Sequence, residues 1–156
     1  MIAFLKRTGF AVTLVVALAA GPVLAQTSPR DFAAEEANRE LVIEFYERFF
    51  NERIVEAAEA LANDYIQHNP QLPDGKDAVL SLVSAFLDEN PEWHGHIVRS
   101  ATDGDLVFLH VHQTNGPEDR GQAIVEIFRV DEGKIVEHWD VIQPVPESAA
   151  NDNTMF

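Results

Sequence analysis

Residues 122–143, QAIVEIFRVDEGKIVEHWDVIQ, decide the fold because they contain two alternating stretches separated by a short turn. Apolar and polar side chains alternate on both sides of Asp131-Glu132-Gly133, which is typical of a β-hairpin. The strands predicted here are Gln122–Val130 and Lys134–Gln143.

The same alternation is present in the preceding thirty residues. Two further strands are predicted at Trp93–Thr102 and Leu106–Thr114, with turns at Asp103-Gly104 and Asn115-Gly116-Pro117. Four strands joined by consecutive turns favour an antiparallel meander.

Before Pro91 the apolar spacing changes to three and four residues, which is typical of amphipathic helices. Ser28-Pro29-Arg30-Asp31 reads as a capping box for the first helix, and Asp74 with Asp77 caps the third. The predicted helices run from about Asp31 to Asn51, from Ile54 to Ala62 and from Asp74 to Asn90, with a turn-rich connection at Tyr65–Pro70. Helices followed by strands indicate an α+β domain, with helices on one face of a curved, mostly antiparallel sheet of four to six strands.

The N-terminal segment has the pattern of a bacterial signal peptide. Lys6 and Arg7 precede an apolar run from Phe10 to Ala20, and small residues lead up to Ala25. The run is shorter than the roughly 20 residues that span a bilayer. We therefore expect cleavage after Ala25 and a periplasmic or secreted protein, with one domain at 26–146 and a loose tail at 147–156.

Composition excludes several classes of function. Acidic residues number 26 against 11 basic ones, for a formal charge of -15. Such a surface repels nucleic-acid phosphates and anionic lipids, so neither nucleic acid nor membrane is an expected partner of the cleaved protein. The chain has no cysteine, which excludes disulfides, thiolate nucleophiles and Cys-ligated metals.

The last strand carries the strongest candidate for catalysis. His138 and Asp140 alternate, so both point to one face of the strand, between Val136 and Ile142. An apolar surrounding disfavours the charged carboxylate, and an imidazole can orient it or share its proton. The pattern predicts a general acid/base pair; an exposed His–Asp pair on a sheet surface is the alternative.

The other histidines and Glu126 allow two interpretations each. His110 and His112 share a face with Phe108, and the spacing from Gly104 to His112 partly matches a cupin metal motif. Glu118 is out of place for that motif and the helical first half does not suit an all-β barrel, so no metal is expected. Glu126 fits either a pocket or an ion pair with Arg129. His68 fits either the mouth of a pocket or a local turn.

Two segments resemble the SnoaL-like proteins of the nuclear transport factor 2-like superfamily. They are Ala123–Gln143, which contains GKIVEHWD at 133–140, and Tyr65–Pro70. The resemblance extends over roughly 40–146. It implies a cone-shaped α+β barrel with an apolar pocket between helices and sheet.

The resemblance also implies a chemistry and a set of site residues. Family cyclases use an aspartate as general acid/base without metal or organic cofactor, a role that falls here on Asp140. His138, His112 and His68 are further catalytic candidates, and the candidates for substrate binding are Glu126, Phe108 and Tyr65. A homodimer through the convex face of the sheet is implied as well.

Three functions are therefore in competition. The first is proton-transfer catalysis, of aldol or isomerase type, on a small apolar carbonyl compound. The second is binding of such a compound without turnover. The third is a dimerising or docking module that uses Trp139 on the outer sheet face as its anchor.

Overall fold

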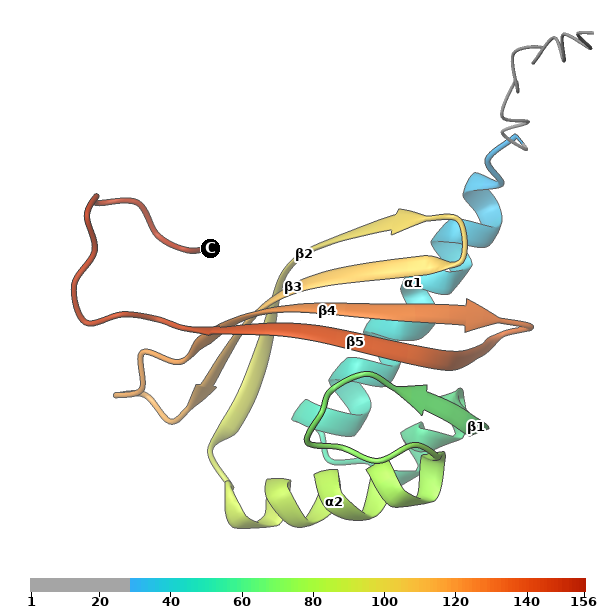
Figure 1. The fold of residues 1–156 in the computed structure, drawn as a ribbon, viewed down its shortest axis with the longest axis horizontal. Helices are drawn as coiled ribbons and strands as arrows, with labels where there is room; N and C mark the ends of the chain where they lie inside the picture. The colour runs from blue at the N-terminus through green and yellow to red at the C-terminus, as the bar shows by residue number, and fades with distance from the viewer. Residues whose placement is uncertain (1–28) are drawn as a thin grey trace, which may run out of the picture.

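The computed structural model describes residues 29–156, so the expected signal segment 1–25 lies outside the described residues. Helices come first and strands last, except for one strand that lies between the helices in sequence (Figure 1). No helix in the described part of the chain is long and apolar enough to cross a membrane.

A curved five-stranded sheet forms the centre of the domain (Figure 1). The strands follow the order β1-β5-β4-β3-β2, so β1 and β2 are the two edges and the sheet stays unclosed. Pairing is antiparallel throughout except between β1 and β5. The strand bounds are β1 Leu61–Gln67, β2 Trp93–Asp103, β3 Leu106–Asn115, β4 Gln122–Asp131 and β5 Lys134–Pro144. This architecture confirms the predicted α+β class and the four predicted hairpin strands.

Helices cover one face of this sheet, called the inner face below. The helix α1 (Phe32–Tyr46) packs against β2 and β3 and continues as a π-helical turn, η1 (Glu47–Asn51). A 3-10 helix, η2 (Val55–Ala60), leads into β1, and α2 (Lys76–Glu89) packs against β1. The predicted second helix is thus a shorter 3-10 helix, and the last turn of the first helix is π-helical.

Two helix starts differ from the predicted capping boxes. Asp31 alone caps α1, because its carboxylate accepts the backbone N–H groups of Ala33 and Ala34. The predicted start of the third helix at Asp74 is wrong. Asp74 Oδ1 instead accepts the N–H of Gln67, and the helix begins two residues later, after Gly75.

The predicted turn at 65–70 is wrong in its first part, which belongs to strand β1. Leu61 and Tyr65 are buried, and the strand lies beside β5. Asn63 and Asp64 disfavour a strand locally, so the pairing with β5 decides the conformation.

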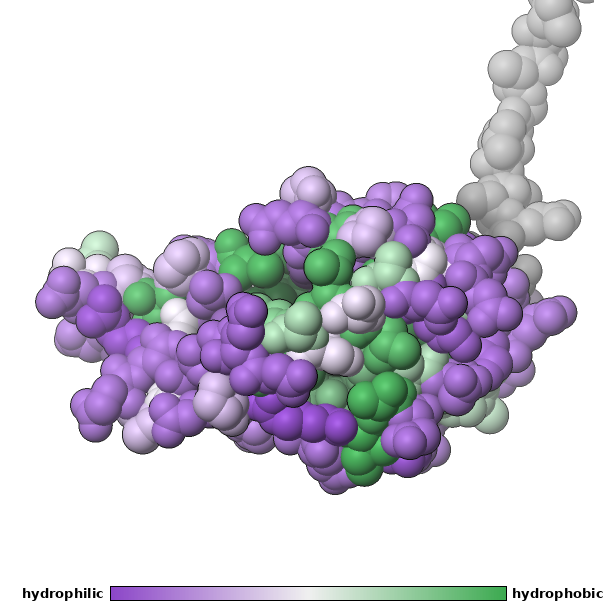
Figure 2. Space-filling view, turned by 90° about the horizontal axis from the view of Figure 1, so that it is seen from below, coloured by the Kyte–Doolittle hydropathy of each residue, from purple (hydrophilic) through white to green (hydrophobic). Residues whose placement is uncertain are grey.

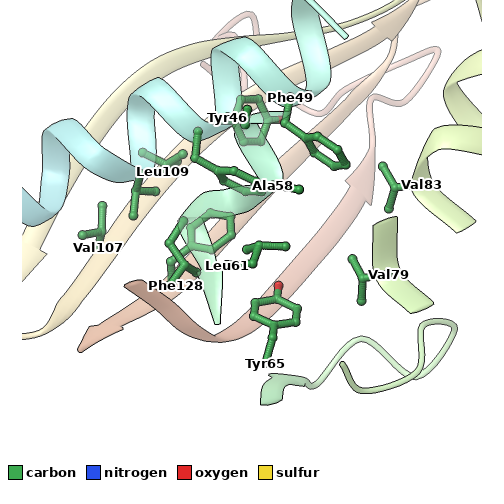
Figure 3. Close-up of a cluster of buried hydrophobic side chains, with 14 of the residues drawn as sticks. Tyr46, Phe49, Ala58, Leu61, Tyr65, Val79, Val83, Val107, Leu109 and Phe128 are labelled. Carbon is green, nitrogen blue, oxygen red and sulfur yellow. The ribbon is translucent and has the colours of Figure 1, made fainter. Parts of the chain in front are cut away.

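The core fills the space between the inner sheet face and the helices (Figure 3). Val107, Leu109 and Val111 of β3 are fully buried. The phenylalanines of α1 and η1 also contact one another: Phe49 stacks on Phe45 and meets Phe50 edge to face. Asn51 fixes the end of η1, since its side chain exchanges two hydrogen bonds of 2.9 Å with the backbone of Gly95 in β2.

The surface on the α2 side is mainly hydrophilic, with a limited apolar area in its middle (Figure 2). Leu82 and Phe86 of α2 are both about half exposed. Residues 147–156 contain no helix or strand, and the ring of the terminal Phe156 stacks on His112 with centroids 4.1 Å apart.

Candidate active site

A small cavity lies between the inner face of β4 and β5 and the helices that cover it. Its volume is about 100 Å³. The helical wall is apolar, with Phe45, Phe49 and Phe50 on one side and Val79 and Val83 on the other. The polar lining residues all come from strands: Tyr65, Gln67, Glu126, His138 and Asp140. An apolar wall with a few convergent polar groups is typical of a ligand site.

Glu126 on β4 and His138 on β5 form a buried pair in this cavity. The Nε2 atom of His138 lies 2.6 Å from Oε2 of Glu126, and the two residues are 7% and 8% exposed. Glu126 is directly opposite Asp140 in the ladder, so its contact with His138 is diagonal on the inner face.

Gln67 determines which ring nitrogen of His138 carries hydrogen. Its Oε1 accepts the backbone N–H of Asn69 at 2.9 Å, which assigns oxygen to that side of the amide. The same Oε1 lies 2.9 Å from Nδ1 of His138, so Nδ1 is the donor in that contact.

One transferable proton therefore lies between Nε2 of His138 and Oε2 of Glu126. With Nδ1 protonated, the pair is either an imidazolium beside a carboxylate or a neutral imidazole beside a carboxylic acid. Both forms hold that proton at the same 2.6 Å contact.

Asp140 is oriented by a second amide. Asn69 Oδ1 accepts the N–H of Gln71, so its Nδ2 faces Asp140 and donates to Oδ2 at 2.6 Å. Among residues 29–156, the other carboxylate oxygen of Asp140 has no hydrogen-bond partner. One oxygen is thus held in place and the other is free to accept a proton from a ligand.

Tyr65 supplies a neutral hydroxyl. Burial raises the pKa of Tyr65, and the charges of Glu126 and Asp140 raise it further. Its hydroxyl points into the apolar cluster, toward Leu61 (Figure 3). The phenol therefore stays protonated at neutral pH and can donate to an anionic oxygen.

The same carboxylates and imidazole are the residues that could hold a metal ion. One ligand atom each from Glu126, His138 and Asp140 lies within 4.8 Å of the other two. The hydrogen bond from Nδ1 to Gln67 is also one that metal-binding histidines commonly make. A cation would have to displace the shared proton, because Nε2 already faces Glu126 at hydrogen-bond distance.

The comparison with known families decides the membership of the chain. A model of the SnoaL-like domain matches residues 42–138. The chain belongs to the SnoaL-like domain family. A comparison with curated proteins finds no match.

Solved structures share the fold of this SnoaL-like chain. A protein from Kribbella flavida, provisionally assigned as a ketosteroid isomerase, superposes with a TM-score of 0.61 at 24% identity, over 75% of this chain and 85% of its own. A SnoaL-like protein of unknown function from Burkholderia thailandensis gives 0.60 at 15% identity, over 69% and 96%. A protein from Acidithiobacillus ferrooxidans, provisionally assigned as a polyketide cyclase, gives 0.59 at 18%, over 68% and 87%.

Of the predicted site residues, Asp140, His138, Glu126 and Tyr65 come together around the cavity of this SnoaL-like domain. His112 and Phe108 do not. They alternate along β3 with the buried valines and leucine, so they point to the outer face. His112 Nε2 donates to the carbonyl of Arg120 at 2.9 Å instead.

His68 also lies on the outer face, against the prediction of a pocket mouth. Its ring stacks on Trp139, and its Nε2 lies 2.8 Å from Glu137. The predicted alternative for Glu126, an ion pair with Arg129, is not formed, because the Arg129 guanidinium bonds Glu137 on the outer face.

Gln67 and Asn69 are the site residues that the sequence analysis missed. The side-chain oxygen of each amide accepts the backbone N–H two residues further on, and each amide also bonds a β5 side chain. The contacts with β5 depend on the parallel pairing of β1 with β5. One pattern in the sequence could have indicated them. Gln67-His68-Asn69 has amides at its first and third positions, and His138-Trp139-Asp140 has its candidate catalytic side chains at the same two positions.

Proposed function

We propose that this SnoaL-like protein is a cofactor-independent acid/base catalyst of proton transfer on a small carbonyl compound. The observation that supports the proposal is one cavity that holds a free carboxylate oxygen on Asp140 and a proton-bearing Glu126–His138 pair. A base and an acid side by side in an apolar cavity are what α-proton abstraction requires.

The proposed step begins at Asp140. Its free oxygen takes a proton from the carbon next to the carbonyl, the C–H electron pair becomes the new C=C bond, and charge moves to the carbonyl oxygen. The Tyr65 hydroxyl or the proton of the Glu126–His138 pair then donates to that oxygen. Return of a proton to a carbon completes an isomerisation, and attack of the enolate on a second carbonyl completes an aldol closure.

The cavity size limits the substrate. A cavity of roughly 150 Å³ holds benzene. The cavity here, about 100 Å³, therefore suits a reacting portion of about four non-hydrogen atoms, such as a carbonyl group with its two neighbouring carbons. The phenylalanine walls favour a largely apolar compound.

The test uses hydrogen exchange, which needs no knowledge of the natural substrate. Cyclopentanone and 3-pentanone are incubated in D₂O with the protein, and loss of the α-proton NMR signal is followed against buffer alone. We expect the wild-type protein to accelerate exchange. Asp140→Asn should abolish that acceleration, and His112→Gln, on the outer face, should keep it.

Two outcomes would contradict cofactor-independent catalysis. Exchange at the buffer rate for every ketone, with saturable binding of one of them, would favour a non-catalytic binding protein. Exchange that is lost on dialysis against EDTA, together with about one bound metal per chain, would favour the cation at Glu126, His138 and Asp140 over the shared proton.

We also propose export through residues 1–25 to the periplasm or the medium. The basic, apolar and small-residue pattern supports this. An intact mass of the secreted protein that begins at Gln26 is the expected result, and retention of Met1 would contradict it.

A homodimer through the outer sheet face is our proposal for the assembly. Val125 and Val141 lie opposite each other there, with exposed fractions of 39% and 65%. Sedimentation should give a dimer that Val141→Lys dissociates. A monomer at all concentrations would contradict it.

A further inference from the structure

Three consecutive residues, the last of β1 and the first two of the loop that follows, meet three consecutive residues of β5, one for one. Gln67 is in register with His138 and bonds its ring at 2.9 Å. Asn69 bonds Asp140 at 2.6 Å. Between these two contacts, the ring of His68 lies on the ring of Trp139.

The three contacts alternate between the two faces of the sheet. The first and third contacts, made by Gln67 and Asn69, lie in the cavity on the inner face. The second contact, made by His68, lies on the outer face. This follows from the side-chain alternation of extended chains. A side chain outside the cavity is therefore anchored between the two amides that orient the acid/base groups.

The middle contact is held by several interactions at once. The rings of His68 and Trp139 are nearly parallel, at 4°, with centroids 4.5 Å apart. His68 Nε2 lies 2.8 Å from Oε1 of Glu137, whose Oε2 accepts from Arg129 at 2.7 Å. The backbone N–H of His68 also donates to the carbonyl of His138 at 2.9 Å.

The chain needs such an anchor at this point. β1 is an edge strand that ends at Gln67, and its register with β5 shifts between Leu61 and Ile66. Beyond Gln67 the chain leaves the sheet, so the position of Asn69 is not set by a continuing ladder. The side chain of His68 replaces that ladder on the opposite face.

We propose that His68 is a positioning residue, which holds the Gln67 and Asn69 amides against His138 and Asp140 from the far side of the sheet. The expected effect on catalysis rests on the proposed acid/base function. The expected effect on the two amide contacts rests on the geometry alone. It assigns His68 no contact with substrate. Both amide contacts are hydrogen bonds, which weaken steeply when donor and acceptor are displaced.

The experiment compares His68→Ala, His68→Phe and His94→Ala. His68→Phe keeps a ring on Trp139 but loses the bond to Glu137, and His94 is an exposed outer-face histidine on β2 that serves as the matched control. Ketone exchange should fall about tenfold in His68→Ala, recover at least partly in His68→Phe and stay unchanged in His94→Ala. The maximal rate should fall rather than the apparent affinity, because no ligand contact is removed.

A second readout does not depend on catalysis. In protein labelled with ¹⁵N at histidine, the ring signals of His138 report its bonds to Gln67 and Glu126. They should shift in His68→Ala and return toward wild type in His68→Phe. A lowered melting temperature with unchanged His138 signals would overturn the proposal and leave a merely structural role. If wild-type protein exchanges no ketone, the proposed function fails, and the His138 signals still decide the role of His68.

Discussion

The two faces of the β4–β5 hairpin carry similar side chains in different settings. On the outer face, Glu137 is bonded by His68 and by the full positive charge of Arg129, and this lowers its pKa. On the inner face, Glu126 has an imidazole and Asp140 a neutral amide as partner, within an apolar cavity. A carboxylate with a permanent cation is fixed in its charged form. Within residues 29–156 the two inner-face carboxylates have no such cation as a partner, which supports our proposal that the chemistry takes place on the inner face.

The largest expected effect comes from Asp140→Asn. Loss of the base should lower ketone exchange by about 10²–10⁴-fold. The melting temperature should stay the same or rise, because the carboxylate is only partly compensated and functional groups often carry a cost in stability. Exchange kinetics and thermal unfolding at pH 7 check both parts.

A different result would assign Asp140 to the structure. If Asp140→Asn lowered the melting temperature by many degrees, and His138→Gln lowered it equally, both residues would have a structural role. The polar residues of the inner face would then serve stability, as those of the outer face do.

Glu126→Gln tests the shared proton. A glutamine amide can donate to Nε2 of a neutral His138, whose Nδ1 still donates to Gln67, so the fold should persist. The pair no longer has a transferable proton, and exchange should fall about 10–100-fold. Full activity in this variant would show that the pair plays no part in proton transfer.

A smaller effect, on stability alone, is expected at Glu137. Its pKa is lowered by the hydrogen bond from His68 and then by Arg129, so its stabilising contribution is present at neutral pH and is lost as the pH falls below the usual glutamate value of about 4.3. Glu137→Gln should cost about 0.5–1 kcal/mol at pH 7, since the network is partly exposed. Urea unfolding should show the two proteins converging toward pH 3; a difference that grows in acid would reverse the sign.

The smallest effect is expected from His112→Gln on β3. A glutamine can still donate to the carbonyl of Arg120, and the residue faces away from the cavity. We expect a change in unfolding free energy within about 0.5 kcal/mol and exchange within about twofold of wild type. A large loss of exchange here would place a catalytic group on the outer face.

The sequence predicted those parts of the fold that local patterns determine. Alternation located β2 to β5 to within a residue or two, and helical spacing located α1 and α2. β1 was missed because Asn63 and Asp64 disfavour a strand locally, and this strand is stabilised by its pairing with β5. The prediction of the site was likewise correct where a local pattern decides and incomplete where pairing between strands decides. Asp140 and His138 share a face by alternation within one strand, whereas the contacts of Gln67 and Asn69 arise between strands.

The wrong prediction that His112 and Phe108 line the pocket also has a physical reason. His112 and Phe108 alternate with apolar residues that could equally have faced outward, since nearly every residue of β3 is at least partly buried. Packing against α1 selects Val107, Leu109 and Val111 for the inner face. Sequence alone does not distinguish two such faces.

The six histidines allow the most direct test of the assignment of the site to the inner face. His138 alone among them lines the cavity; the other five, His68, His94, His96, His110 and His112, lie on the outer side of the sheet. Imidazole NMR signals are recorded while a ketone that undergoes exchange is added. We expect a saturable shift of the His138 signals, with the signals of the other five histidines unchanged. A shift of His110 or His112 with His138 unmoved would contradict it.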